Sequence, residues 1–339
     1  MKIGVVGDVH WSKYSSIVRS RGNKYSTRLE NCINSVSWAE RTLEENDCDL
    51  VVYLGDFFDS SDLKSEELSA LNEIRWNSLK HIFLVGNHEM GLNDLSISSC
   101  HLFNLLDNIE VIDKPGFSEQ YKDLFFLPYI LEENRKSVKE YLKGKTDCII
   151  FSHNDLKGIQ LGKFVSQTGF ELDEIENSCN LFINGHIHNG MNISSKIINL
   201  GNLTGQNFSE DATKYGHRIM IIDTDTLECE YFVNPFAFNF FKFDLTTDTT
   251  YNEMIKVLWT SNNPVFTVKA FASDDLDFSD IFTIVAHRTI IQPIVTHSES
   301  NEKAYESLSV NHLEKFKEYI LNELGNSNDV LEELSAVVQ

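Results

Sequence analysis

The sequence Leu54-Gly55-Asp56-Phe57-Phe58-Asp59 follows an apolar, β-branched run at residues 50–53. Such a run is typical of a buried parallel strand, so Asp56 lies where this strand is predicted to end. A glycine and a carboxylate at the carboxyl end of a strand are how an open α/β sheet presents groups to a ligand crevice. Taken alone, the stretch is better explained as an ordinary Gly-Asp turn, and a functional interpretation requires that the arrangement recur.

The same arrangement recurs at four other predicted strands. Each is a short apolar run followed directly by histidine, aspartate or asparagine. These residues are Asp8 and His10 after residues 2–7, Asn87 and His88 after residues 81–85, His153 after residues 148–152, and His186 and His188 after residues 181–185. An amphipathic pattern at residues 28–46 predicts the helix that connects the first two strands as a β-α-β crossover. The pattern favours an α/β fold whose strand ends share one polar site.

Taken one at a time, these polar residues have ordinary structural explanations, but together they require five coincidences at the same end of parallel strands. Asp8 and His10 alternate along an extended chain, so both side chains can approach one cation. The complete set mixes imidazole nitrogens with carboxylate and amide oxygens and contains no thiolate, which suits two divalent ions. Manganese is the expected metal, with iron or zinc as alternatives. His88 directly follows Asn87 and must point elsewhere, so it is a candidate for contact with the substrate.

The composition describes a globular chain with a strong negative charge. Its 339 residues are 42% hydrophobic, which allows two domains, or one large domain with an appendage. The net charge of −22 argues against broad, sequence-independent attraction to nucleic acid. No segment approaches the ~18 apolar residues of a membrane span, and the apolar run at the N-terminus is too short for a signal peptide, so a cytoplasmic location without membrane contact is expected. The 6 dispersed cysteines are expected to be reduced thiols.

Five motifs, in chain order, resemble the signature of the calcineurin-like metallophosphoesterases. They are Gly7-Asp8-Val9-His10, Gly55-Asp56-x-x-Asp59, Gly86-Asn87-His88-Glu89, His153 and Gly185-His186-Ile187-His188. The resemblance covers residues 1–235 and implies a four-layer α/β/β/α sandwich, with two sheets face to face and helices outside. It also implies that one ion is held by Asp8, His10 and His188, that the other is held by Asn87, His153 and His186, and that Asp56 bridges them. His88 would act on the substrate, supported by Asp59.

Other parts of the sequence narrow the range of possible substrates. Phosphoprotein phosphatases continue with arginine after the aspartate at position 59, whereas this chain has Ser60 and lacks that bidentate phosphate clamp. Residues 198–204, 208–211 and 216–223 instead resemble the SbcD-type nucleases of double-strand-break repair, phage recombination endonucleases included. That resemblance implies a metal-dependent DNA exonuclease or endonuclease, homodimeric, in a recombination and repair complex with an ABC-type, coiled-coil ATPase. If phage-encoded, it would act in the host cytoplasm.

Three other functions remain as alternatives. A small-substrate phosphodiesterase or a phosphoprotein phosphatase of the same superfamily would use the same metal site. A non-catalytic scaffold is disfavoured because no ligand position has been lost. A purely structural DNA-end-binding protein would show DNA affinity without metal-dependent turnover.

The catalytic domain is assigned to residues 1–235. The sequence that follows it predicts two further units. Residues 236–300 alternate short apolar strands with polar turns and one helix, which suits a small α+β cap. The resemblance to the SbcD-type nucleases implies that this cap faces DNA. Residues 301–339 contain amphipathic helices, which by the resemblance would bind the ATPase partner. From the pattern alone, the first unit could also be an edge subdomain without a ligand, and the helices could pack on their own chain.

A basic segment at residues 11–29 stands out in this acidic chain because it contains no acidic residue. Its cations are Lys13, Arg19, Arg21, Lys24 and Arg28. The segment lies close in sequence to the ligand His10, so we hypothesise that it guides the DNA backbone to the site. A solvated loop is the alternative. Nothing resembles a base-reading module, so cleavage is expected to be independent of sequence.

Overall fold

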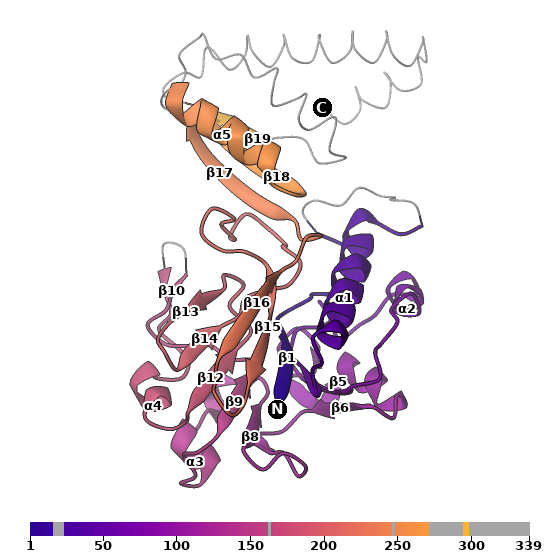
Figure 1. Cartoon of the computed structure of the whole chain (residues 1–339), viewed down its shortest axis with the longest axis vertical. Coiled ribbons are helices and arrows are strands. Elements are labelled where there is room, and N and C mark those ends of the chain that lie inside the picture. The colour runs from indigo at the N-terminus through magenta and orange to yellow at the C-terminus, as the bar shows by residue number, and fades with distance from the viewer. Residues whose placement is uncertain (16–23, 162–163, 246–247, 271–293, 298–339) are drawn as a thin grey trace.

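Two six-stranded sheets form the body of the molecule in a computed structural model that describes residues 1–15, 24–161, 164–245, 248–270 and 294–297 (Figure 1). The first sheet has the order β16-β15-β1-β2-β3-β6 and the second β13-β14-β12-β9-β8-β7. The strands of the first are β1 Lys2–Val6, β2 Leu50–Tyr53, β3 Lys80–Leu84, β6 Ile109–Ile112, β15 Arg218–Asp223 and β16 Cys229–Val233. Those of the second are β7 Gly116–Phe117, β8 Leu124–Leu127, β9 Ile149–Ser152, β12 Leu181–Asn184, β13 Met191–Asn192 and β14 Ile197–Asn199.

Parallel pairing dominates the centre of both sheets. In the first sheet β1, β2, β3 and β6 run parallel, and in the second β8, β9, β12 and β14 do so. All four residues of β2, β9 and β12 are buried, as expected for strands covered on both faces. Because these strands run in one direction within each sheet, their carboxyl ends lie along one edge.

Alternate side chains of the strands build three apolar layers. Between the sheets, Ile3 and Val52 of the first pack with Phe151 and Ile183 of the second. The outer face of the first sheet is covered by α1 Thr27–Glu45 and α2 Ser65–Leu71, and that of the second by α3 Val138–Leu142 and α4 Leu172–Glu176 (Figure 1). The predicted four-layer α/β/β/α sandwich is therefore confirmed.

The remaining short elements lie outside the two six-stranded sheets. They are β4 Met90–Gly91, β5 Asp94–Ser98, η1 Ser99–Leu105, η2 Glu132–Asn134, β10 Gln160–Leu161 and β11 Phe164–Val165.

All six cysteines are free thiols, as predicted. Within the part of the chain that the structure describes, no helix is long and apolar enough to cross a membrane.

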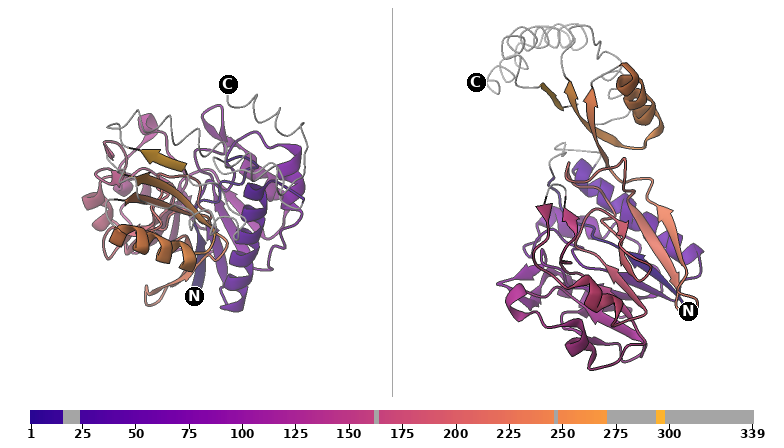
Figure 2. Two further views of the ribbon diagram at one scale, coloured as in Figure 1. Left: turned by 90° about the horizontal axis from the view of Figure 1, so that it is seen from above. Right: turned by 90° about the vertical axis from the view of Figure 1, so that its left-hand side faces the viewer.

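A third, smaller sheet follows the sandwich. It contains β17 Asn239–Leu245, β18 Pro264–Ala270 and β19 Ile294–His297, paired in parallel in that order. Helix α5 Asp248–Thr260 connects β17 to β18 and lies against one face of the sheet (Figure 2). The domain boundaries at residues 236–300 and 301–339 stay predictions, and the predicted C-terminal helices lie outside the described residues.

Candidate metal centre

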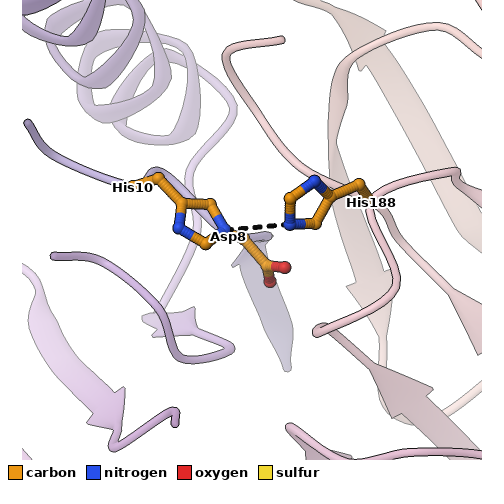
Figure 3. A group of neighbouring side chains, drawn as sticks. All are labelled: Asp8, His10 and His188. Atoms are coloured by element: carbon orange, nitrogen blue, oxygen red, sulfur yellow. Dashed lines mark hydrogen bonds between the residues drawn. The ribbon is translucent and has the colours of Figure 1, made fainter. Parts of the chain in front are cut away.

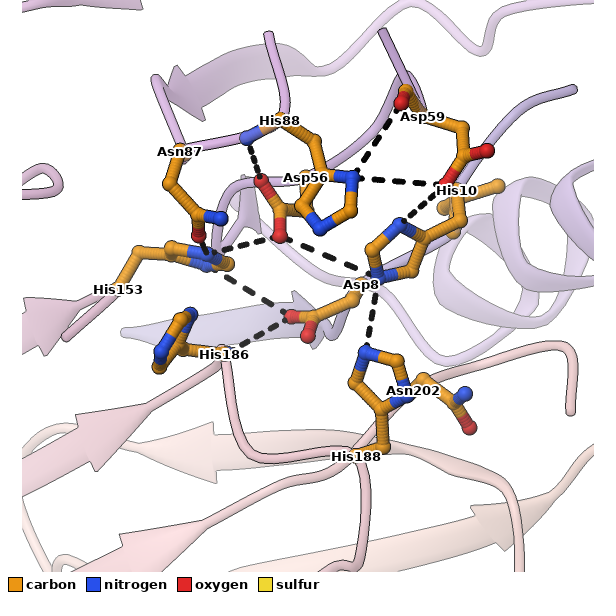
Figure 4. A network of polar contacts seen from close by, with 12 residues as sticks. Asp8, His10, Asp56, Asp59, Asn87, His88, His153, His186, His188 and Asn202 are labelled. Carbon is orange, nitrogen blue, oxygen red and sulfur yellow. Dashed lines mark hydrogen bonds and ion pairs between the residues drawn. The ribbon is translucent and has the colours of Figure 1, made fainter. Parts of the chain in front are cut away.

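The strand ends bring all seven predicted metal ligands together. Asp8 and His10 follow β1, Asp56 follows β2, Asn87 follows β3, His153 follows β9, and His186 and His188 follow β12 (Figure 4). Among the described residues, three sets of histidine and aspartate side chains have ligand atoms within 4.8 Å of one another, and two of these sets consist only of predicted ligands. One is Asp8, His10 and His188 (Figure 3), and the other is Asp56, His153 and His186. Asn87 joins the second set, since its Oδ1 lies 3.2 Å from His153 Nε2.

The backbone at these strand ends is tightly turned. His10, Asp56 and His186 adopt positive φ angles of 49°, 47° and 69°, which is uncommon for residues other than glycine. Such strain costs about 1–3 kcal/mol per residue and persists only where the surroundings enforce it. Close packing explains the glycine before Asn87, because a Cβ at Gly86 would lie 2.1 Å from Asp56 Oδ1. The turns thus aim ligand side chains of both sheets into one volume.

Each histidine of the centre is held by an acceptor on one ring nitrogen. His10 Nδ1 lies 3.0 Å from Asp59 Oδ1, His188 Nδ1 3.2 Å from Glu210 Oε1, His186 Nε2 3.1 Å from Asp155 Oδ1, and His153 Nδ1 2.9 Å from the Leu54 carbonyl oxygen. An acceptor at one nitrogen fixes the proton there and leaves the other nitrogen with a lone pair. The other nitrogens of His10 and His153 lie toward Asp56, and that of His188 lies toward His10 (Figure 4).

These inward atoms fit divalent cations. Asp8 Oδ2 and His186 Nδ1 are buried and have no hydrogen-bond partner among the described residues. His10 Nε2 and His188 Nε2 lie 3.0 Å apart, and two facing lone pairs repel unless a proton or a cation lies between them. Buried acceptors are otherwise almost always partnered. The donor set and its unpartnered atoms therefore match the two divalent ions that the sequence predicts.

The charges of the centre favour cation binding. Burial opposes ionisation of Asp56, but the neighbouring His153 and His10 outweigh it and lower the pKa of this carboxyl. Burial likewise opposes protonation of His153, yet the Asp56 carboxylate raises the pKa of this imidazole to about 9 in the metal-free protein. Asp56 Oδ2 lies 3.1 Å from His153 Nε2 and 3.9 Å from His10 Nε2. One carboxylate thus lies between histidines of both sets, as a bridging ligand must.

His88 lies at the exposed mouth of the cluster. Its side chain is 41% exposed, whereas His10 and His153 are fully buried. His88 Nδ1 lies 3.2 Å from the Asp59 carbonyl oxygen and 3.5 Å from Asp59 Oδ1, and its backbone N–H donates to Asp56 Oδ1. The Asp59 carboxylate is nearer to His10 than to His88, so it contacts both rings rather than His88 alone. The catalytic role of His88 and the supporting role of Asp59 stay predictions.

Three acidic residues of the site were not assigned from the sequence. Asp155 and Glu210 hold ligand histidines, and Glu89 accepts hydrogen bonds from the backbone N–H groups of Phe58 and Gly86, at 3.0 and 2.7 Å. Glu89 thereby connects the loops after β2 and β3. Asp155 follows His153 by two residues, the same spacing as in Asp8-Val9-His10, and that spacing was an available signal. Glu210 has no comparable local signal.

The structure corrects the prediction for Arg28. Its side chain is 1% exposed, and its guanidinium donates to the carbonyl oxygens of Val9, His10 and Gly205 at 2.9–3.1 Å. A guanidinium placed in this way cannot reach a DNA backbone, and it instead holds the strained turn that carries His10. The prediction failed because a cation in a basic segment gives no sign that it will be buried.

The other residues of the basic segment are only partly described. Lys13 Nζ lies 3.6 Å from Glu66, and Lys24 forms an ion pair with Glu73, so carboxylates of the neighbouring segment offset both charges. Arg19 and Arg21 lie outside the described residues. The interaction of these four cations with DNA is still untested.

Replacing Arg28 by methionine is expected to lower the free energy of unfolding by about 3 kcal/mol, because three carbonyl oxygens lose charge-assisted donors inside the protein. Urea denaturation of the metal-free protein measures this loss. Lys24→Met, at an exposed position, is the control and is expected to change stability by less than about 0.5 kcal/mol. An Arg28 variant of unchanged stability but weakened DNA binding would restore the original interpretation.

Comparison with known proteins identifies the family. No curated protein sequence matches the chain. A solved structure, that of a dimetal phosphatase from Danio rerio, is similar with 14% identity and a TM-score of 0.38, covering 69% of this chain and 99% of that one. The family model for calcineurin-like phosphoesterases matches residues 1–190, which include every predicted metal ligand. Since this match extends over more than half of the 339 residues, the chain belongs to the calcineurin-like phosphoesterases, a family of metal-dependent phosphate-ester hydrolases.

Proposed function

We propose that the chain is a DNA nuclease that hydrolyses phosphodiester bonds at a centre of two divalent ions, most favourably manganese. We further propose that it is the nuclease subunit of a recombination and repair complex with an ABC-type ATPase. The support from sequence is the resemblance of residues 198–223 to SbcD-type nucleases. The support from structure is the attachment of the third sheet beside the metal centre.

The start of β17 is bonded to the loop that carries Glu210. Phe238 N–H donates to the Thr204 carbonyl and Ala212 N–H to the Phe240 carbonyl, each at 3.0 Å, and the rings of Phe208 and Phe240 are in edge contact. Figure 1 shows the third sheet above the end of the sandwich at which β1 ends, the same end as the metal centre. A substrate at the metal centre would therefore lie near a second structured unit. An extended polymer can contact both, whereas a small ester would use only the first.

A cavity beside the centre offers space for more than a phosphate. It measures about 240 Å³ and is lined by Trp11, Tyr14, Asp59 and Lys64, among others. Tyr14, one of the lining residues, is 63% exposed. Exposed aromatic rings stack unpaired bases of single-stranded nucleic acid at about 1–3 kcal/mol per base. The cavity therefore supports a nucleotide chain as substrate, with a base next to the phosphate that reacts.

The roles proposed for the chain's residues follow from their placement. Asp8, His10 and His188 would hold one ion and Asn87, His153 and His186 the other, with Asp56 shared between them. Such a pair of ions activates water and neutralises the charge of the phosphoryl group. His88 Nδ1 faces the Asp59 carbonyl, so Nε2 of the protonated ring is the N–H that can donate to the leaving oxygen. The Asp59 carboxylate lies 3.5 Å from His88 Nδ1 and would help to orient the ring.

The charge of −22 has to be overcome locally. The bound ions are themselves the largest positive charges near the substrate. Lys13, Arg19, Arg21 and Lys24 are proposed to add to this field along the DNA backbone. Replacing Arg19, Arg21 and Lys24 with alanine is then expected to weaken DNA binding and to flatten its salt dependence, whereas unchanged binding would assign the segment to an ordinary solvated loop.

End-labelled linear duplex DNA, incubated with the purified full chain and manganese, tests the proposed function. Manganese-dependent degradation is expected, and EDTA is expected to abolish it. A small chromogenic phosphodiester run in parallel separates the alternatives. Rapid turnover of the small ester with intact DNA, and no cleavage after addition of a candidate ATPase, would move the assignment to a small-substrate phosphoesterase.

The proposed ATPase interaction is tested by deleting residues 304–339. The truncated protein is expected to keep its manganese-dependent nuclease and to lose co-purification with the ATPase. Size-exclusion chromatography of both forms tests the proposed homodimer. A truncated protein that unfolds would show instead that these residues pack on their own chain.

A further inference from the structure

The histidines of the two proposed ion sites are held by different kinds of acceptor. In the first site, His10 and His188 both face carboxylates, those of Asp59 and Glu210. A carboxylate behind a ligand histidine fixes the ring and makes the opposite nitrogen a stronger donor to a metal. Both imidazoles of the first site therefore receive this support.

The histidines of the second site receive less support from carboxylates. His186 faces the carboxylate of Asp155, whereas the acceptor nearest to His153 Nδ1 is the neutral carbonyl of Leu54, at 2.9 Å, and the Asp8 carboxylate lies farther away, at 3.7 Å. The ligands themselves differ in the same sense, because the first site has the Asp8 carboxylate where the second has the neutral amide of Asn87. The first site is therefore more negative both among its ligands and among the groups behind them, and a divalent cation is attracted more strongly to it.

Glu210 is a buried carboxylate with several hydrogen-bond donors around it. It is 2% exposed, and its two oxygens accept hydrogen bonds from Asn202 Nδ2 at 2.8 Å and from the Gln206 N–H at 2.9–3.1 Å. His217 Nε2 lies 3.6 Å from the same carboxylate. A carboxylate with this many donors is held in one orientation, and its contact with His188 Nδ1 therefore fixes the orientation of the His188 ring.

Asp155 is more loosely held. Its side chain is 28% exposed, and the cation behind it is Arg135, whose NH2 is 3.8 Å from Asp155 Oδ2. Arg135 in turn donates to the Ile130 carbonyl at 3.2 Å. Asp155 thus orients His186 from a loop near the surface, whereas Glu210 orients His188 from the protein interior.

We propose that Glu210 and Asp155 are positioning residues that each act on one ion, and that the ion held with His188 binds more tightly than the ion held with His186. The centre then fills in two steps, with the second ion entering at higher metal concentration. This inference concerns metal binding alone and does not depend on the identity of the substrate.

Manganese titration of the metal-free, full-length protein tests the order of filling. Equilibrium dialysis counts the bound ions, and electron paramagnetic resonance distinguishes an isolated manganese ion from a spin-coupled pair. Two classes of binding, separated by at least about 10-fold in Kd, are expected, with the isolated-ion signal preceding the coupled signal. A single class of two equivalent ions, with the coupled signal from the first addition, would overturn the proposal without the use of any variant.

Two variants assign the classes. Glu210→Gln is expected to weaken the tight class, and Asp155→Asn the weak class, each by about 10–100-fold. Their controls are Asp211→Asn, next to Glu210 but turned to Thr213 and Lys214, and Glu132→Gln, which removes the other anion beside Arg135. Circular dichroism and thermal melting of the metal-free proteins check folding.

Because Asp155 is partly exposed, Asp155→Asn keeps the assignment testable even if Glu210→Gln fails to fold. Loss of the weak class alone in Asp155→Asn, with the tight class at its wild-type Kd, supports the proposal. Equal weakening of both classes by Asp155→Asn, or no change in either, contradicts it. Because no DNA is present, these outcomes stand apart from those of the nuclease assay.

Discussion

Replacing His88 by alanine is expected to lower turnover of a phosphodiester by about 10²–10⁴-fold and to leave two bound manganese ions per chain. The ring lies at the exposed mouth, and the Asp59 carbonyl 3.2 Å from Nδ1 orients it. Its removal takes away the donor proposed for the leaving oxygen and leaves every proposed ligand of either ion in the sequence. kcat is expected to fall more than KM rises, since the contact strengthens as charge develops.

A different role for His88 is conceivable on geometric grounds and can be distinguished. His10, Asp56 and His88 also offer ligand atoms within 4.8 Å of one another, so His88 lies close enough to belong to an ion site. Loss of metal together with activity in His88→Ala would make His88 a ligand and overturn its assignment as the substrate-contacting group. His101→Ala is the matched control, because His101 pairs with Asp113 away from the centre. That variant is expected to keep both metal and turnover.

The ligand set was predictable because each member follows a strand that contains a short apolar run. Such runs mark buried parallel strands, and the polar residue after each run must then lie at the shared edge of its sheet. Asp56, His153 and His186 come from three different strands, yet the structure brings them within 4.8 Å. The order of strands in the two sheets was not needed for this inference, since direction alone places the strand ends.

Long-range side-chain pairing could not be predicted in the same way. Arg28 and Glu210 resemble surface residues in sequence, and both are almost fully buried. Arg28 donates to the Gly205 carbonyl, 177 residues away in sequence, and Glu210 contacts His188, 22 residues away. Neither pairing leaves a periodic or local signal, because a charged side chain is buried only when distant partners satisfy it. The roles of Arg28 and Glu210 therefore became visible only in the folded chain.

Replacing Asp56 by asparagine is expected to have the broadest effect of any single substitution, because this side chain lies between the two ligand sets. It is 1% exposed, accepts a hydrogen bond from the His88 N–H on Oδ1, and places Oδ2 3.1 Å from His153 Nε2 and 3.9 Å from His10 Nε2. Asparagine keeps the shape and the acceptor for His88 but removes the shared negative charge. Both ions are therefore expected to bind more weakly, and turnover to fall by about 10³-fold or more.

Thermal melting with and without manganese measures this effect independently of activity. An ion at a concentration 100 times its Kd stabilises a protein by about 2.7 kcal/mol, so two ions are expected to raise the wild-type stability by about 5 kcal/mol. Asp56→Asn is expected to lose most of that increase, whereas Asp155→Asn would lose only the part due to the weaker ion. Asp62→Asn removes the same charge from a nearby exposed position and is the control, with an unchanged metal-dependent shift. A full shift in Asp56→Asn would show that the two ions do not share this carboxylate, and the bridging role would then have to be abandoned.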